Sequence, residues 1–354
     1  MYKFRPFKQV PKLIFGPDSL NRIEELIPFK IENEYILLVF DVFFKKNLPK
    51  ILENFDIEII FFDSKKGEPK TEHIDLFRNE ILKKRSNIIP KVIVGIGGGS
   101  AMDVAKSLSI VFTNEGIASD FQGWDLVKEK AVYKIGVPTI AGSGSEASRT
   151  AVLTSGTKKM GINSDYSMFD AIILDENLLK TVPNETFVFS AMDCFVHCVE
   201  SLQGTFKNEL SESIASKALE LCSEALLNDK INYSKLLTAS YLGGVSIVNS
   251  EVGICHALSY GLSLEYNYRH GYANTIVFNQ LEEYYGDHIN KFKEILKIHK
   301  IELPKNLSLS FTDSKLEKMI DMTLKMERPL ENALGDNWKK ILTREKVKSL
   351  IKML

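Results

Sequence analysis

Four short apolar runs in the first half of the chain constrain its fold most strongly. Each run is of strand length and is bounded by polar or turn residues; they cover 35–40, 57–62, 92–96 and 171–174. Near-continuous apolar runs are typical of strands covered on both faces, as in a parallel sheet with crossover helices. We therefore expect residues 1–180 to form an α/β domain with a Rossmann-like parallel sheet.

The apolar pattern changes beyond Pro183. Segments 210–227 and 233–248 carry apolar residues three and four positions apart, which is the period of an amphipathic helix. A chain of 354 residues also exceeds one ordinary hydrophobic core. We expect residues 181–354 to form an all-α helical domain. No Gly-, Pro- or Ser-rich linker separates the halves, so the two domains should pack closely with a cleft between them.

The charge balance and the cysteine content limit the classes of partner and compartment. The formal net charge is -1, which favours neither nucleic acid nor an anionic membrane and leaves small polar ligands as the expected partners. The N-terminal residues lack a signal-type apolar stretch, and no run approaches the roughly 20 apolar residues of a membrane span. The four cysteines lie mostly in apolar helical patterns. We expect a cytoplasmic protein with reduced thiols.

Asp193 and His197 begin a candidate metal site. They are four residues apart, so a helix over 191–201 places both side chains on one face, about one turn apart. The apolar segment 252–261, which contains His256, also predicts a helix.

His270 completes the candidate set. It follows a polar break at 265–268, which is consistent with a helix start. One carboxylate and three imidazoles suit zinc or ferrous iron. A single histidine is more often a hydrogen-bonded structural residue, but the spacing of this set favours a metal site. His73, His288 and His299 lie among charged or surface-type residues and receive no role.

A glycine-rich turn follows the apolar run at 92–96. It comprises Gly97, Gly98, Gly99 and Ser100 and leads into a predicted helix. Glycines let the backbone approach an oxygen-rich ligand, and the free amides at a helix start favour a pyrophosphate. The alternative is an ordinary tight turn between a strand and a helix.

Asp41 ends the first of the four apolar runs. A carboxylate there can accept hydrogen bonds from an adenosine ribose and repel a 2′-phosphate, which favours NAD over NADP. The usual dinucleotide fingerprint places its acid about 20 residues after the glycines, whereas Asp41 precedes them. A solvated acid at a strand end is the alternative.

Four motifs in this order resemble the iron-containing (group III) alcohol dehydrogenase family over nearly the whole chain. They are 97–100 with Asp103, the segment Val137–Glu146, the segment Met192–Glu200, and the stretch from His256 to Gly271. The resemblance implies a dinucleotide-binding domain, a helical domain and one divalent metal in the cleft, and often a homodimer. It places the metal ligands at Asp193, His197, His256 and His270, and the cofactor contacts at Asp41, the glycine loop, Thr139 and Lys159.

Tyr260 is a departure from the family pattern. Many members that act on simple alcohols have a second histidine four residues after the third metal ligand, where it is linked to proton release; this chain has Tyr260 there. Either the tyrosine hydroxyl takes over the proton relay, or the proton leaves by another route. The electron acceptor, nicotinamide or dioxygen, stays open for the same reason.

Within the family the chain looks most like the branch that oxidises C8 of 3-deoxy-manno-octulosonate (Kdo), an eight-carbon sugar acid of lipopolysaccharide biosynthesis, before transamination. The segments that carry this likeness are 122–126, 148–154, 163–166 and 200–206. A sugar acid requires a cation for its carboxylate and polar groups for its hydroxyls. The candidates are Arg149, Asn163, Ser164, Tyr166 and Arg269, each of which taken alone is more often a surface or packing residue.

Three alternatives to this substrate remain. The nearest alternative is a dehydrogenase of the same architecture that acts on a small alcohol, aldehyde or polyol. A relative of the dehydroquinate synthases or glycerol dehydrogenases would share the glycine loop but not this ligand set. A non-catalytic nucleotide- or metal-binding module would use the metal only to hold the two domains together. Such a structural site is coordinatively closed, whereas a catalytic site keeps a position for water or substrate.

Overall fold

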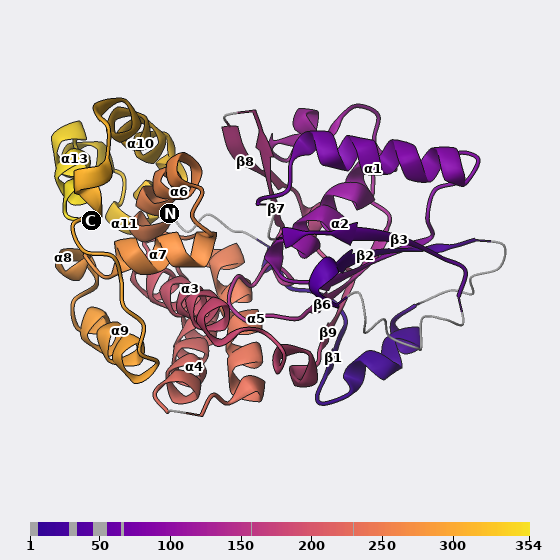
Figure 1. The fold of residues 1–354 in the computed structure, drawn as a ribbon, viewed down its shortest axis with the longest axis horizontal. Helices are drawn as coiled ribbons and strands as arrows, with labels where there is room; N and C mark the ends of the chain where they lie inside the picture. The colour runs from indigo at the N-terminus through magenta and orange to yellow at the C-terminus, as the bar shows by residue number, and fades with distance from the viewer. Residues whose placement is uncertain (1–5, 28–33, 45–54, 65–66, 157, 229) are drawn as a thin grey trace. The chain divides into compact units, whose positions relative to one another are not determined.

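The computed structural model describes residues 6–27, 34–44, 55–64, 67–156, 158–228 and 230–354, and its contacts divide the chain into two compact units (Figure 1). The sheet unit comprises Gln9–Ile140 and Ser145–Thr181. The helical unit comprises Ala141–Gly144, Val182–Leu354 and the described residues before Gln9. The short loop Ala141–Gly144 therefore belongs to the helical unit, although both segments that flank it belong to the sheet unit.

The sheet unit contains two sheets and their covering helices. Its strands are β1 (Leu13–Phe15), β2 (Ile36–Asp41), β3 (Ile57–Phe62), β4 (Val92–Gly97), β5 (Gly123–Trp124), β6 (Tyr133–Pro138), β7 (Thr150–Ser155), β8 (Lys158–Asn163) and β9 (Ala171–Leu174). Its longer helices are the 3-10 helix η1 (Ser19–Leu26) and the α-helices α1 (Thr71–Lys84) and α2 (Gly99–Val111).

The main sheet is six-stranded and has the order β1-β9-β6-β4-β2-β3. All its pairs are parallel, which confirms the predicted sheet. The four apolar runs form β2, β3, β4 and β9. From β2 the chain passes to β3 on one side and then to β4 on the other, so the strand order reverses between β2 and β4. In open parallel sheets, ligands bind at the carboxyl ends of the strands at such a reversal.

Both faces of the main sheet are covered. On one face, alternate residues of four strands pack with Leu20, Ile23 and Leu26 of η1. On the other face, Gly95 of β4 lies so close to α2 that an added Cβ would stand 2.8 Å from the Cβ of Ala105. Covering on both faces explains why the runs that form these strands are apolar at nearly every position.

A smaller sheet of order β5-β8-β7 completes the sheet unit. Strands β7 and β8 are antiparallel, whereas β5 runs parallel to β8 and pairs with it over Gly123 and Trp124. We did not predict this sheet, because its strands mix polar and apolar residues.

The helical unit contains only helices among its named elements. Its α-helices are α3 (Asn184–Gln203), α4 (Glu209–Leu226), α5 (Tyr233–Ser250), α6 (Ile254–Tyr266), α7 (His270–Phe278), α8 (Glu282–Tyr285), α9 (Asp287–Ile298), α10 (Asp313–Lys325), α11 (Glu327–Leu334), α12 (Trp338–Ile341) and α13 (Arg344–Lys352), and η8 (Leu307–Ser310) is a short 3-10 helix. The predicted helices at 210–227 and 233–248 correspond to α4 and α5. Among the described residues, no helix is both long enough and apolar enough to cross a membrane.

Helix α3 lies at the centre of this unit and packs against α4, α5 and α7. It begins after Pro183 and ends before Gly204. Its buried Phe195 contacts the rings of Phe278 and Phe292, at centroid distances of 6.1 and 5.9 Å. The helix is buried over most of its length, so its polar side chains require partners within the unit.

The loop Ala141–Gly144 is seated against α3 and α5. The amide of Gly142 donates to Ser240 Oγ at 2.7 Å. Gly142 has φ +150°, and a Cβ there would lie 1.9 Å from the carbonyl oxygen of Ser190. Only glycine fits this position, because both the backbone conformation and the space exclude a side chain.

Candidate metal and nucleotide sites

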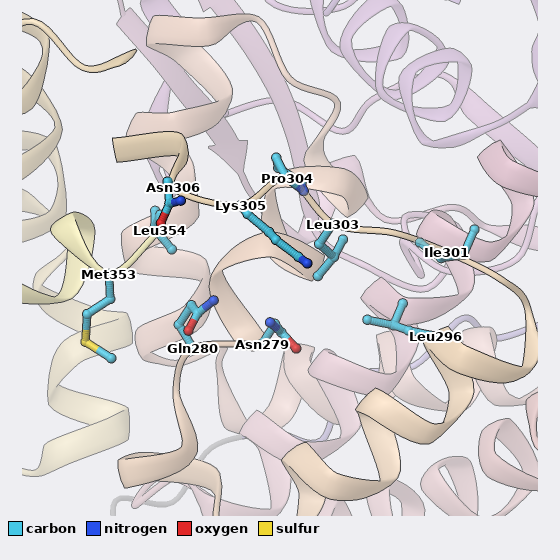
Figure 2. A pocket seen from close by; sticks show the side chains of 10 residues that line it. All are labelled: Asn279, Gln280, Leu296, Ile301, Leu303, Pro304, Lys305, Asn306, Met353 and Leu354. Carbon is cyan, nitrogen blue, oxygen red and sulfur yellow. The ribbon is translucent and has the colours of Figure 1, made fainter. Parts of the chain in front are cut away.

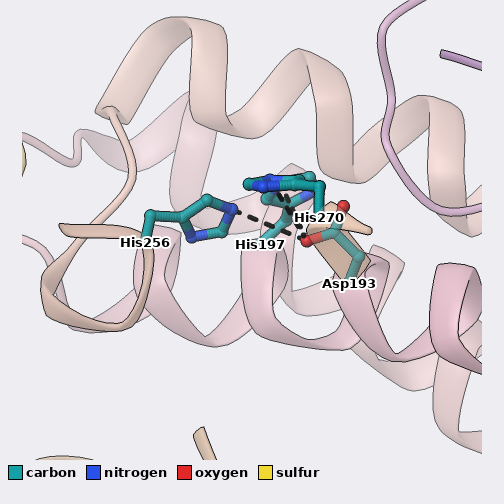
Figure 3. A group of neighbouring side chains, drawn as sticks. All are labelled: Asp193, His197, His256 and His270. Carbon is teal, nitrogen blue, oxygen red and sulfur yellow. Dashed lines mark ion pairs between the residues drawn. The ribbon is translucent and has the colours of Figure 1, made fainter. Parts of the chain in front are cut away.

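Three helices of the helical unit bring the four predicted metal ligands together. Asp193 and His197 lie one turn apart on α3, His256 lies on the first turn of α6, and His270 is the first residue of α7. One ligand atom from each residue lies within 4.8 Å of those of the others. Figure 3 shows the imidazole rings directed at the carboxylate of Asp193.

The distances between these atoms suit a shared cation. The Nε2 atoms of His197, His256 and His270 lie 3.7, 3.6 and 3.9 Å from Asp193 Oδ1. These distances are too long for hydrogen bonds. Two atoms that each lie about 2.0–2.2 Å from one zinc ion are at most about 4.4 Å apart. The three distances to Asp193 lie below this limit, and the donor set is one that zinc or ferrous iron prefers.

One side of the cluster is open to solvent. The side chains of Asp193, His197 and His256 are only 2–4 % exposed, whereas the side chain of His270 is 30 % exposed. A small molecule can therefore reach the cluster along His270. A site that keeps an open side is typical of catalytic rather than structural metal centres.

Glu200 on α3 orients His256, and sequence reasoning missed it. Its fully buried carboxylate lies 2.5 Å from His256 Nδ1. It also accepts hydrogen bonds from the amides of Gly253 and Cys255 and from the Tyr285 hydroxyl, at 2.7–2.8 Å. The carboxylate thus satisfies amide groups at the start of α6. With a proton held on Nδ1 by Glu200, Nε2 is the nitrogen of His256 that would bind a metal.

Asn274 is the second residue that sequence reasoning missed. Its amide donates to Asp193 Oδ1 at 2.6 Å, and its Nδ2 lies 3.1 and 3.2 Å from Nε2 of His256 and His270. Its own oxygen accepts a hydrogen bond from Ser259. Asn274 stands one turn after His270, and Glu200 three residues after His197. Residues three or four positions apart lie on the same face of a helix, so these spacings could have predicted both residues from the sequence.

The electrostatics of the cluster favour a cation. Burial opposes ionisation of both Asp193 and Glu200. Three neighbouring histidines nevertheless lower the pKa of Asp193. His256, the Tyr285 hydroxyl and the Gly253 amide lower the pKa of Glu200. Burial lowers the pKa of His197. Burial also opposes charge on His256, yet Glu200 and Asp193 raise its pKa to about 10. Two ionised carboxylates in a buried site attract positive charge strongly.

In the sheet unit, the carboxyl ends of β2, β4 and β6 bring three predicted cofactor residues together. Asp41 ends β2 and Gly97 ends β4, and a Cβ on Gly97 would stand 3.1 Å from the Cβ of Asp41. The amide of Thr139, which follows β6, donates to the carbonyl of Gly97 at 2.9 Å. This edge coincides with the reversal of strand order. The tertiary position of Asp41 therefore removes the difficulty posed by its position in the sequence.

The glycine loop leads directly into α2. Gly98 precedes the helix and, having no side chain, provides no cap for the amides of its first turn. Gly97 cannot carry a side chain, because a Cβ would lie 2.6 Å from the Cβ of Ala101. Free amides at the start of this helix, with Gly99 and Ser100 as its first residues, are what a pyrophosphate requires.

Asp103 and Lys159 are already engaged within the sheet unit. The carboxylate of Asp103 accepts hydrogen bonds from Ser145 Oγ at 2.8 Å and from the amide of Val152 at 3.1 Å. Burial raises the pKa of Asp103 and lowers that of the neighbouring Lys106. Lys159 Nζ lies 2.9 Å from Glu68 Oε1. This placement favours a supporting role for Asp103, which holds the segment after β6.

The predicted substrate residues of the sheet unit surround Arg149. The guanidinium of Arg149 forms ion pairs with Asp125 and Asp165. The amide of Asn163 donates to the carbonyls of Gly123 and Gly161. Ser164 is buried, and its Oγ accepts from the amide of Tyr166 at 3.2 Å. Of these predicted contacts, Tyr166 is the one exposed at the surface, at 42 %.

The two predicted residues that remain lie near His270. The Tyr260 ring stands edge-on to the His270 ring, with 6.1 Å between the centroids. Arg269 is exposed, and its Nη1 lies 3.5 Å from Thr186 Oγ1. Helix α6 continues through part of the predicted polar break and ends at Tyr266, because Asn267 adopts a left-handed conformation that closes it.

A separate hollow of about 460 Å³ lies at the other end of α7 (Figure 2). Asn279, Lys305 and Leu354 are among the residues that line it. None of the predicted site residues contributes to it, so it takes no part in the proposed chemistry.

Comparisons with known proteins place the chain in one enzyme family. Residues 11–176 match the description "Iron-containing alcohol dehydrogenase", and residues 187–335 match "Fe-containing alcohol dehydrogenase family, C-terminal". The chain is therefore a member of the iron-containing alcohol dehydrogenase family. Enzymes of this family use a divalent metal and NAD(H).

Individual relatives support this assignment. Alcohol dehydrogenase 4 of Saccharomyces cerevisiae is 26 % identical over 286 residues, which cover 77 % of this chain and 74 % of the relative. The 4-hydroxybutyrate dehydrogenase of Clostridium kluyveri is 30 % identical over 285 residues, which cover 76 % and 74 %. The structure of an alcohol dehydrogenase from Oenococcus oeni shares the fold, with a TM-score of 0.85, 20 % identity and coverage of 98 % and 99 %.

Proposed function

We propose that this alcohol dehydrogenase oxidises the C8 hydroxyl of 3-deoxy-manno-octulosonate to the aldehyde, with NAD as hydride acceptor, ahead of transamination to the 8-amino sugar. The convergence of Asp193, His197, His256 and His270 carries the reaction class. The likeness of segments 122–126 and 163–166 to the octulosonate branch supports the substrate. A relative named for 4-hydroxybutyrate adds that an acidic substrate is compatible with the family.

The proposed chemistry divides between the residues of the two units. A divalent cation bound by the four ligands supplies Lewis acidity, which lowers the pKa of an alcohol hydroxyl. Glu200 fixes the tautomer of His256, and the exposed edge of His270 leaves room for the substrate. In the sheet unit, the amides at the start of α2 hold the pyrophosphate of the cofactor, and Asp41 accepts hydrogen bonds from its ribose.

The second candidate is a dehydrogenase for a small alcohol or aldehyde, which the yeast relative favours by its name. A rate comparison of the metal-reconstituted protein separates the two. We expect a higher kcat/KM for 3-deoxy-manno-octulosonate than for ethanol or 1,3-propanediol, with nicotinamide absorbance rising and no oxygen uptake. A preference for the short alcohols would overturn the sugar-acid proposal. Oxygen uptake during turnover would show that dioxygen, rather than the nicotinamide, is the electron acceptor.

Asp41→Asn should weaken the discrimination against NADP. The amide keeps the oxygen that accepts from the Phe43 amide at 2.9 Å, so the turn after β2 is preserved. The negative charge that would repel a 2′-phosphate is lost. We expect the NAD/NADP ratio of kcat/KM to fall about tenfold, equivalent to about 1.4 kcal/mol. An unchanged ratio would place cofactor selection at another residue.

Arg269→Ala should weaken the binding of an acidic substrate. Arg269 is exposed beside the ligand His270, whereas the charge of Arg149 is already paired with Asp125 and Asp165. A hydrogen bond to a charged group is worth about 1.5–3 kcal/mol, so we expect KM for the sugar acid to rise about 10- to 100-fold. Rates with short alcohols should be unaffected. If Arg149→Ala produces this effect instead, carboxylate recognition lies in the sheet unit.

Tyr260→Phe tests the proposed proton relay. The variant keeps the ring beside His270 and removes only the hydroxyl. We expect kcat near neutral pH to fall about 100-fold, the lower end of general acid–base contributions, and the loss to shrink as the pH rises because hydroxide replaces the relay. Tyr284→Phe on α8 serves as the matched control. A uniform fall at every pH would argue against proton transfer through this residue.

A homodimer is also proposed from the family resemblance. Light scattering that gives the mass of one chain, 40.0 kDa, would exclude it.

A further inference from the structure

The side-chain amide of Asn274 lies over three of the four proposed metal ligands. Its Nδ2 is 2.6 Å from Asp193 Oδ1, 3.1 Å from His256 Nε2 and 3.2 Å from His270 Nε2. Asp193 Oδ1 is itself 3.6 Å from His256 Nε2 and 3.9 Å from His270 Nε2. A nitrogen this close to all three atoms stands over the triangle that they form. We call this triangle the Asn274 face.

Neighbouring groups fix which end of the amide is turned toward the cluster. The carboxylate of Asp193 can only accept, so the NH2 group of Asn274 faces it. The amide oxygen accepts a hydrogen bond from Ser259 on α6. The side chain is fully buried, and α7 places it one turn after His270. An amide NH2 group is a donor only. Asn274 therefore presents hydrogen atoms, and not a ligand atom, to the Asn274 face.

The Asn274 face is one of four triangular faces that the four ligand atoms define. Three imidazoles and one carboxylate already complete a tetrahedral site, so an alcohol oxygen has to add as a further ligand through one of these faces. Nδ2 of Asn274 stands where an oxygen entering through the Asn274 face would have to be. Each of the other three faces includes His197. Of the four ligand side chains, that of His270 is the most exposed, at 30 %.

From this geometry we propose that Asn274 is a positioning residue that closes the Asn274 face, so that an alcohol oxygen reaches the metal only between His197 and His270. The volume of the side chain excludes water from the closed face, and its amide hydrogens repel a cation, which favours a metal position toward His197. This role is separate from the hydrogen bond that orients Asp193. It rests on the proposed metal cluster and holds for any alcohol substrate.

Cobalt(II) makes the number of ligands measurable without turnover. Its visible absorption is strong with four ligands and weak with five or six, because geometry determines the spectrum of such an ion. The samples are the full chain and its Asn274→Leu and Asn274→Ala variants, each loaded with cobalt alone. Leucine is branched at the same carbon as asparagine and keeps its volume without its donors. Alanine leaves a space that water can fill.

We expect both variants to bind cobalt about 10- to 100-fold more weakly, because both lose the hydrogen bond to Asp193. Only Asn274→Ala should lose visible absorption, because water then adds through the opened face. Asn274→Leu should keep the wild-type spectrum. Asn279→Ala, which alters the residue that follows the last turn of the same helix, is the matched control and should change neither affinity nor spectrum.

Azide, a small ligand for cobalt, tests the number of entry faces in the same samples. In the wild type, 1,3-propanediol should displace azide, because one position serves both. In Asn274→Ala, azide should stay bound at saturating 1,3-propanediol, because the opened face supplies a second position. Azide that stays bound to the wild type under these conditions would overturn the proposal.

Three results with cobalt alone would also overturn this role of Asn274. Stronger absorption in Asn274→Ala would mean that Asn274 is itself a ligand. An unchanged spectrum would mean that it closes no face. Loss of cobalt by both variants would mean that its hydrogen bonds, rather than its volume, build the site. A wild-type chain that binds no cobalt would instead refute the proposed metal cluster, whereas a failure to oxidise sugar acids would leave the role of Asn274 intact.

Discussion

Replacing His256 with alanine is expected to remove the bound metal and the dehydrogenase activity together. His256 supplies one of the four proposed ligand atoms, and its Nε2 lies 3.6 Å from Asp193 Oδ1. A Lewis acid contributes several kcal/mol to such a reaction, so we expect activity to fall about 1,000-fold or more. The metal content per chain, measured by mass spectrometry of the purified protein, should fall in parallel with the rate.

His73→Ala is the matched control for this experiment. His73 is an exposed histidine on α1 of the sheet unit, so its replacement should leave both metal content and rate unchanged. If His256→Ala keeps its turnover, the metal assignment is refuted. If it keeps the metal and loses the turnover, His256 acts on the substrate rather than as a ligand.

Glu200→Gln is expected to weaken metal binding about 10- to 100-fold, the usual cost of losing the partner that orients a histidine ligand. The glutamine has nearly the same shape. However, it brings an amide donor to a position where four donors already point: His256 Nδ1, two backbone amides of α6 and the Tyr285 hydroxyl. Zinc affinity should be measured by competition with a chromogenic chelator, and the folding of the metal-free variant by circular dichroism.

Tyr285→Phe makes a smaller change to the hydrogen bonds of Glu200 and should have a smaller effect on zinc affinity. It removes one hydrogen bond at 2.7 Å and leaves the carboxylate and its contact with His256 in place. Its zinc affinity should therefore lie between those of the wild type and Glu200→Gln. If Glu200→Gln remains folded and binds zinc as tightly as the wild type, the orientation of His256 does not depend on this carboxylate.

The parallel sheet was predictable because its signal is local. The segments 57–62 and 171–174 have apolar side chains at most positions, and both are strands with those bounds. The same holds for Asp193 and His197, since a spacing of four within one helix fixes their common face. Neither inference requires knowledge of how distant segments meet.

The smaller sheet and the seated loop were not predictable in this way. Strand β5 has two residues and depends on β8 for its pairing. The loop Ala141–Gly144 reads as an ordinary glycine-rich turn, and only its contacts with Ser190 and Ser240 show why glycine stands at Gly142. These features arise from contacts between residues about 40 or more positions apart, which no local pattern encodes.

By itself, the sequence determined the fold class, the helical placement of two metal ligands and the presence of a glycine turn before a helix, because periodicity and chain stiffness act over a few residues. The tertiary structure alone decided that His256 and His270 reach Asp193, that Glu200 and Asn274 orient the cluster, and that Asp41 meets Gly97. It also decided that the guanidinium of Arg149 forms ion pairs with two carboxylates. A side chain's chemistry depends on its neighbours in space, and folding brings those neighbours from segments far apart in the chain.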